Sequence, residues 1–224
     1  MLNIFQNLFS NVWGLVINAV ITLIALTGHE LAHAWVSTKL GDPTPRMEGR
    51  LSFNPLAHLD LVGTILMILT GFGWAKPVGI NPAYYRDRKK GTALTAAAGP
   101  LANLAMSFIA LLIYYIFALI VVKAHIAVGA LYAVQGFVSA FVVRNLCFMV
   151  FNLIPIPPLD GAKVLGIFLS NRAYYTMLRY ERYSMILIML LSLTGVFGSI
   201  IGTGVNFVFG ALTGFFNGLF NLVA

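Results

Sequence analysis

Residues Thr27–Trp35 read TGHELAHAW, and this stretch lies at the inner end of an apolar run that begins near Phe9. In a helix, residues four apart lie one above the other on the same face, so the imidazoles of His29 and His33 can reach one metal ion. This spacing is typical of zinc sites. Because Glu30 directly follows the first histidine, its carboxylate can lie beside the metal and take a proton from a bound water.

The composition of the chain indicates an integral multi-pass protein of the cell membrane. Hydrophobic residues make up 59% of the sequence and charged residues 9%, and the mean hydropathy is +0.88. A soluble domain has about 25% charged residues. Ionisable side chains inside a spanning segment are costly, so the trio His29, Glu30 and His33 marks a functional site rather than ordinary packing. We expect the lipid bilayer as a partner.

Long apolar segments predict an all-α polytopic fold with about five to six transmembrane helices. The expected segments are 9–38, 91–122, 128–150, 184–201 and 205–222. We treat residues 1–224 as one membrane-embedded domain, with a core at 9–170 and accessory helices at 184–222.

A shorter apolar run at 59–72 has basic residues on both flanks, so the positive-inside rule places both of its ends on the cytoplasmic side. We therefore expect a re-entrant segment, which membranes tolerate where it lines a cavity enclosed by protein. All 14 Lys and Arg residues except Lys123 and Arg144 fall on the side assigned to the cytoplasm. The net charge of +7 thus reflects topology, and we expect no nucleic-acid partner.

A proline-broken segment supplies the candidates for completing the metal site. Residues Phe151–Gly161 read FNLIPIPPLDG, and three prolines in four residues cannot continue a regular helix. Zinc hydrolases normally have three protein ligands and a fourth position for water. The candidates for the third ligand are Asp160, Asp60 and His58. We favour Asp160, because an unpaired carboxylate at membrane depth needs a cation.

Three motifs together resemble the site-2 protease family of intramembrane zinc metallopeptidases. They are HELAH, the glycine-proline-x-x-asparagine pattern of Gly99–Asn103, and NLIPIPPLDG, and they occur in the family's order. The resemblance implies three ligands for one zinc ion per chain: His29, His33 and Asp160. It also implies that Glu30 is the general base and that Asn152 helps to hold the substrate or the tetrahedral intermediate.

The run Arg50–Asp60 and the sequence GWAKPV at 73–78 are similar to the compact prokaryotic branch of this family, whose members have neither PDZ nor CBS domains. This likeness implies an endopeptidase that cuts peptide bonds in or near the transmembrane segments of a protein or peptide substrate. Because His29 lies ten residues before Lys39 at the cytoplasmic end, we expect cleavage close to the cytoplasmic face. Residues 73–78 are a candidate edge for capturing unwound substrate by backbone pairing, and Trp74 and Lys76 fit an interfacial anchor pair at least as well. The sequence leaves the oligomeric state open.

The alternative function is a membrane metal-ion transporter that uses the same cluster of His29, Glu30, His33 and Asp160 as a transit site. A transit site gains nothing from a glutamate that is held off the metal. We therefore favour the peptidase.

Overall fold

The computed structural model describes residues 12–70, 76–124 and 129–223, and every regular element in these ranges is helical. The expected all-α architecture is therefore confirmed.

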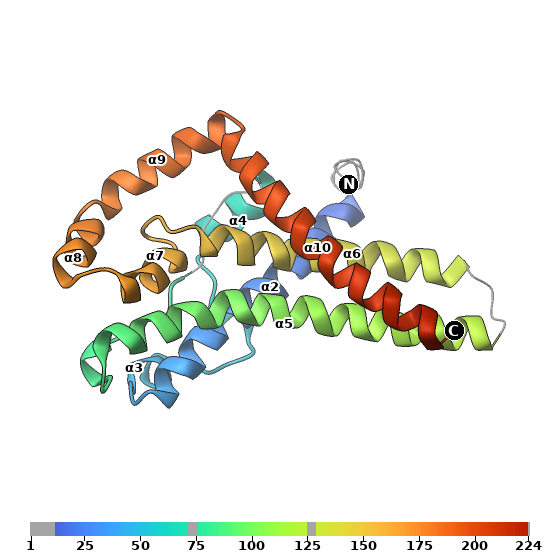
Figure 1. Cartoon of the computed structure of the whole chain (residues 1–224), viewed down its shortest axis with the longest axis horizontal. Helices are drawn as coiled ribbons and strands as arrows, with labels where there is room; N and C mark the ends of the chain where they lie inside the picture. The colour runs from blue at the N-terminus through green and yellow to red at the C-terminus, as the bar shows by residue number, and fades with distance from the viewer. Residues whose placement is uncertain (1–11, 71–75, 125–128, 224) are drawn as a thin grey trace.

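Four long helices form the body of the molecule: α2 (Val12–Lys39), α5 (Arg88–Lys123), α6 (Gly129–Leu153) and α10 (Val196–Val223). These four are, within the described ranges, the helices long and apolar enough to cross a bilayer. Figure 1 shows α5 and α6 running side by side, with α2 behind them and α10 crossing in front. The expected five to six spans stay a prediction.

Shorter helices lie between and beyond the long ones. They are α3 (Thr44–Met47), α4 (Leu61–Thr70), α7 (Asp160–Leu165), α8 (Asn171–Arg179) and α9 (Glu181–Leu193). Three short 3₁₀ turns are Pro55–Ala57, Pro82–Tyr84 and Gly166–Phe168. In Figure 1, α8 and α9 extend away from the bundle and lead back to it through α10.

The apolar run at 59–72 forms α4, whose 10 residues rise about 15 Å, or half the thickness of a bilayer core. The backbone N–H of Lys76 donates to the carbonyl of His58 at 3.1 Å, so the two ends of this excursion lie side by side. A re-entrant segment requires such a return. The re-entrant placement itself stays a prediction, and residues 71–75 lie outside the described ranges.

The helix boundary near the C-terminus differs from the expected one. The sequence predicted a break between 201 and 205, whereas the chain turns at Gly195, whose φ of +76° lies in the left-handed region that favours glycine. Gly204 lies inside α10, where an added Cβ would come within 2.8 Å of Val150 Cγ1. The predicted boundary was wrong because glycine also serves close helix packing in membranes.

The outer surface of the bundle is apolar, as a lipid-facing surface must be. Isoleucines spaced along one face of α5 are each more than half exposed: Ile109, Ile113, Ile116 and Ile120. Inside, Leu146, Val205 and Phe216 belong to one buried cluster that joins α5, α6 and α10. Such a stripe on a soluble monomer would be an aggregation surface, so lipid is the environment that suits it.

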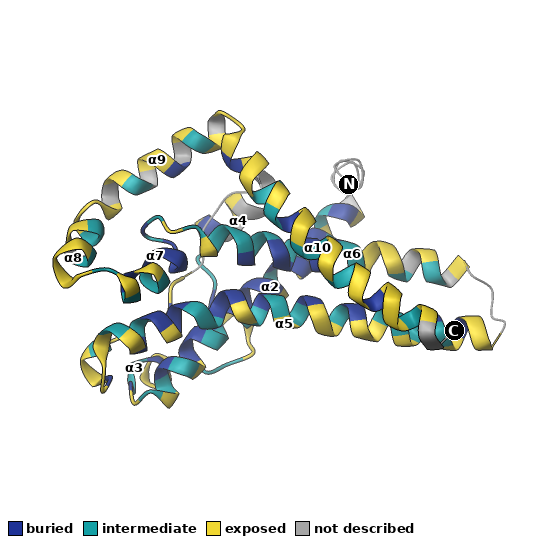
Figure 2. Cartoon of the chain, in the orientation of Figure 1, coloured by how far each residue is buried: buried dark blue, intermediate teal, exposed yellow. Residues whose placement is uncertain are grey.

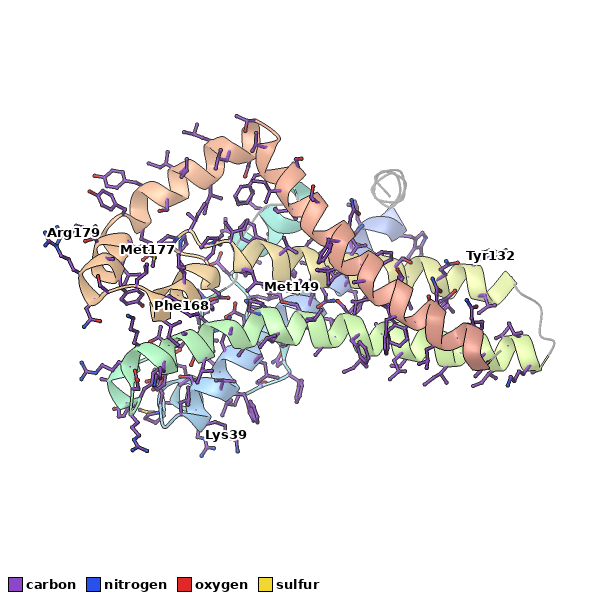
Figure 3. The ribbon with its side chains drawn as sticks, in the orientation of Figure 1. Lys39, Tyr132, Met149, Phe168, Met177 and Arg179 are labelled. Carbon is purple, nitrogen blue, oxygen red and sulfur yellow. The ribbon has the colours of Figure 1, made fainter. Side chains whose placement is uncertain are left out.

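Charge is concentrated at one end of the molecule. Figure 3 places Lys39 and Arg179 at the same end and Tyr132 near the other. Figure 2 shows that buried residues gather where α2, α5, α6 and α7 meet. The buried residues there include polar side chains, among them His29, His33 and Asp160. Buried polar side chains at the centre of an otherwise apolar protein indicate a functional site.

Candidate metal centre

Three side chains from two distant parts of the chain converge at the buried centre. His29 and His33 project from α2, and Asp160 is the first residue of α7. The Nε2 atoms of the two histidines lie 3.0 Å apart. Asp160 Oδ2 lies 3.2 Å from His29 Nε2 and 3.1 Å from His33 Nε2. All three residues are at most 6% exposed.

The hydrogen bond of His29 determines which of its nitrogens faces the centre. Its Nδ1 lies 2.6 Å from Asn103 Oδ1. The Asn103 amide nitrogen donates to Ala25 O and to Asn145 Oδ1, which fixes the side-chain oxygen toward the histidine. His29 therefore carries its proton on Nδ1, and Nε2 presents a lone pair.

His33 has the same arrangement with a backbone partner. Its Nδ1 lies 2.7 Å from the carbonyl oxygen of Thr95 in α5, which can accept but not donate. Two imidazole lone pairs and a carboxylate oxygen thus meet at one point, and these acceptors repel one another unless a cation lies between them. Ligand atoms on a tetrahedral zinc ion lie about 3.3 Å apart, close to the observed separations.

Gly99 in α5 leaves the space beside this centre open. A Cβ added at Gly99 would come within 2.6 Å of His29 Nε2 and still closer to His33 Nε2. The next residue, Pro100, has no N–H and donates nothing to the carbonyl four residues before it, in the turn that carries Thr95. The absence of a side chain at position 99 therefore gives the two imidazoles the room they need.

Replacing Gly99 by alanine is expected to weaken zinc binding about 10 to 100-fold, the range seen for changes just outside a ligand set. The added methyl group would crowd both ligand nitrogens. The matched control is Gly136→Ala in α6, where an added Cβ meets nothing within 4 Å. Competition with a chromogenic chelator measures both affinities, and equal values for the two variants would contradict this account.

Asp160 reaches the histidines because the chain reverses tightly after α6. A Cβ at Gly161 would collide with the carbonyl of Leu153, the last residue of α6, so glycine is required for this close approach. Asp160 Oδ1, the oxygen turned away from the histidines, lies 3.6 Å from Lys163 Nζ. The lysine thus leaves Oδ2 free for the centre.

Glu30 lies beside the centre without joining the three-residue group that could hold a metal. It is 9% exposed, and its Oε2 accepts a hydrogen bond from the backbone N–H of Val78 at 3.3 Å. Sequence patterns do not reveal this contact, because any residue type at position 78 except proline would offer the same N–H. The other carboxylate oxygen has no hydrogen bond to protein in the described residues.

The segment that carries Val78 is held by a buried arginine. The Arg50 guanidinium donates to the carbonyls of Ala57, Lys76 and Pro77 at 2.5, 3.3 and 3.1 Å. It also lies 3.5 Å from Glu48, whose carboxylate accepts the N–H of Gly79. Arg50 therefore joins the loop before α4 to the loop after it.

These contacts bear on the expected substrate-capturing edge at 73–78. Residues 73–75 lie outside the described ranges. In the rest of the edge, the N–H groups of Lys76 and Val78 donate to His58 and Glu30, and Pro77 has no N–H. Pairing with a substrate strand at these positions would require exchanging bonds that the protein already makes.

The other candidates for the third ligand lie elsewhere. Asp60 Oδ1 accepts the N–H of Gly63 and caps the first turn of α4. His58 is fully buried, and its Nε2 lies 2.8 Å from Ser52 O. Neither belongs to the group formed by His29, His33 and Asp160, which is the metal-compatible group found among the described residues.

The side chain of Asn152 is engaged within its own helix. Its amide nitrogen donates to the carbonyl of Phe148, one turn earlier in α6, at 3.1 Å. No hydrogen bond joins Asn152 to the three candidate ligands within the described ranges. A role in holding substrate would require its side chain to leave that bond.

Three curated relatives each carry the name "Putative zinc metalloprotease". YwhC of Bacillus subtilis (strain 168) is 37% identical over 179 residues, which cover 78% of this chain and 80% of the relative. MJ0611 of Methanocaldococcus jannaschii is 32% identical over 152 residues, or 65% of this chain and 69% of the relative. Rip2 of Mycolicibacterium smegmatis is 28% identical over 178 residues, which cover 77% of this chain and 64% of the relative. No family model and no solved structure matches the chain.

The fold and the site, taken with these names, define a membrane protein of the zinc metalloprotease class. The chain belongs to the family of these zinc metalloproteases, in agreement with its resemblance to the compact site-2 proteases. The expectation of a zinc cofactor is thereby confirmed, and the buried histidine-aspartate group is the place that could hold it.

Proposed function

We propose that this protein is an intramembrane zinc endopeptidase that hydrolyses peptide bonds in or near the transmembrane segments of membrane proteins. The depth of the site carries the proposal. His29 lies ten residues before Lys39, which ends α2, or about 15 Å along the helix. A buried metal-binding group at that depth has membrane-embedded chains as its natural substrates.

The residues have distinct roles in this proposal. His29, His33 and Asp160 hold zinc, which when bound supplies a Lewis acid and a water of lowered pKa. Glu30 accepts the proton that the attacking water loses and returns it to the departing amine nitrogen. The Val78 N–H donates to Glu30 Oε2, which leaves Oε1 to accept and return that proton. Asn152 stabilises the developing oxyanion if its amide turns away from Phe148.

The orientation of the site follows from the distribution of charge. Lys39 at the end of α2 and Arg88 at the start of α5 belong to the basic end of the molecule, and the positive-inside rule assigns that end to the cytoplasm. The site lies nearer to this end, so we place cleavage close to the cytoplasmic face. Among the described residues, no feature favours a metal transporter over the peptidase.

The proposal is tested with the purified protein in proteoliposomes. The substrates are two single-pass proteins that differ within the transmembrane segment, one with an uninterrupted leucine helix and the other with a Gly-Pro pair in the half of the segment nearer the cytoplasmic side. We expect cleavage of the second inside its apolar segment, because peptide bonds must leave the helix before they can be attacked. A soluble unfolded protein is the third substrate. Mass spectrometry locates each cut, and cleavage of the soluble chain alone would overturn the proposal.

A further inference from the structure

A row of buried polar groups leads away from the metal centre along the junction of α2 and α5. Ser37 Oγ lies 2.8 Å from Asp42 Oδ2 and 2.7 Å from the hydroxyl of Tyr85. The same Tyr85 hydroxyl lies 3.0 Å from Thr95 Oγ1. Since the carbonyl of Thr95 accepts the Nδ1 proton of His33, the row ends on a candidate metal ligand. We call Asp42, Ser37, Tyr85 and Thr95 the Asp42 relay.

The Asp42 relay is sealed from solvent. Ser37 and Asp42 are fully buried, Thr95 is 1% exposed and Tyr85 is 5% exposed. The hydroxyl groups and the carboxylate all have protein partners. A fully satisfied polar network of this kind rigidifies its surroundings, and a missing member would leave buried groups unpaired.

The carboxylate at the far end gives every hydroxyl one orientation. Asp42 also accepts the backbone N–H groups of Thr44 at 2.9 Å and Asn81 at 2.8 Å. Burial alone would raise the pKa of Asp42, but hydrogen bonds from the Thr44 side chain, from the backbone N–H groups of Asn81 and Thr44, and from Ser37 outweigh it and lower the pKa, so the group stays ionised. Ser37 therefore donates to Asp42, Tyr85 donates to Ser37, and Thr95 donates to Tyr85.

Tyr85 is the member that joins the two helices. Its ring lies so close to Gly91 in α5 that a Cβ there would collide with the ring. Its hydroxyl bonds Ser37 in the last turns of α2 and Thr95 in α5. The phenol thus holds the turn of α5 that presents a carbonyl to His33.

We propose that Tyr85 is a positioning residue for the metal site, acting through Thr95 to hold the carbonyl that orients His33. In zinc proteins the partner of a ligand imidazole fixes its tautomer and direction and raises its basicity. Here that partner is a backbone carbonyl, which mutation cannot remove. The side chains that fix the position of this carbonyl therefore determine the orientation of His33. The inference rests on the proposal that His33 binds the metal, and it does not depend on the identity of the substrate.

The test compares zinc affinities of the full chain in detergent. Tyr85→Phe keeps the ring and removes the hydroxyl, and it is expected to weaken zinc binding about tenfold, at the low end for groups outside the ligand set. Tyr84→Phe is the matched control, because Tyr84 is 55% exposed and adjacent. A second variant, Thr95→Val, breaks the Asp42 relay at another point, and combining it with Tyr85→Phe should weaken binding no further than either change alone.

Two additional measurements separate positioning from general stability. Thermal unfolding with a chelator present reports the fold without metal, and a positioning role predicts that the affinity loss persists well below that unfolding temperature. His33→Ala should abolish binding. If it does, while Tyr85→Phe binds zinc within twofold of the wild type or no more weakly than Tyr84→Phe, the positioning role is overturned. If His33→Ala still binds zinc normally, the proposed metal site fails, and the inference fails with it.

Discussion

Glu30→Gln is expected to lose about 10² to 10⁴-fold in cleavage rate while keeping a full complement of zinc. Positioned acid-base groups contribute rate factors of this size. The amide has nearly the size of the carboxylate, and its oxygen can still accept the Val78 N–H, so the local structure should persist. It cannot take a proton from water. Single-turnover cleavage and zinc content per chain measure the two quantities.

The chain offers a close control for this change in Glu48. Its carboxylate also accepts a backbone N–H from the same segment, that of Gly79 at 3.2 Å, but its side chain is 41% exposed. Glu48→Gln removes the same charge outside the metal centre and should keep most of the activity, because exposed ion pairs contribute little. A Glu30→Gln protein that cuts at the wild-type rate would refute the assignment of Glu30 as the general base.

Local periodicity explains which parts of the site the sequence could predict. The helical repeat alone brings His29 and His33 to one face of α2. Asp160 could be favoured over Asp60 because the proline-broken segment before it, residues 151–159, contains no charged residue. Both arguments use side-chain identity and short-range geometry, which a sequence displays directly.

The remaining contacts depend on backbone groups and on the meeting of distant segments. The acceptor for His33 is the carbonyl of Thr95, and the donor to Glu30 is the N–H of Val78. Every residue has a carbonyl and nearly every residue has an N–H, so no residue type marks these partners. Tyr85 gives no periodic signal either, since it lies in the irregular segment before α5 and reaches α2 through one hydroxyl.

Glycine illustrates a different limit of prediction from sequence, because the same residue type can end a helix or lie within one. Gly195 ends a helix through a positive φ, whereas Gly204 lies inside α10 and permits contact with Val150. Gly99 opens space for the two imidazoles. Whether a glycine forms a turn, permits a helix contact or leaves room for ligand side chains depends on its tertiary neighbours. For this reason the boundary between α9 and α10 could not be located from the sequence.

Asp160→Asn is expected to weaken zinc binding more than about 100-fold, beyond the loss typical of partners outside the ligand set. The substitution retains an oxygen near His29 and His33 but removes the negative charge. It also leaves Lys163, which lies 3.6 Å from Oδ1, beside a neutral group. The positive lysine would then face a bound cation without a carboxylate between them.

Asp60→Asn is the control, since Asp60 caps α4 through the N–H of Gly63 and asparagine caps helices about as well as aspartate. Chelator competition should show wild-type affinity for this control and a large loss for Asp160→Asn, with both proteins unfolding at similar temperatures when zinc is removed. Equal zinc affinity in the two variants would mean that the third ligand is another residue. The close approach of Gly161 to Leu153 would then serve only to turn the chain.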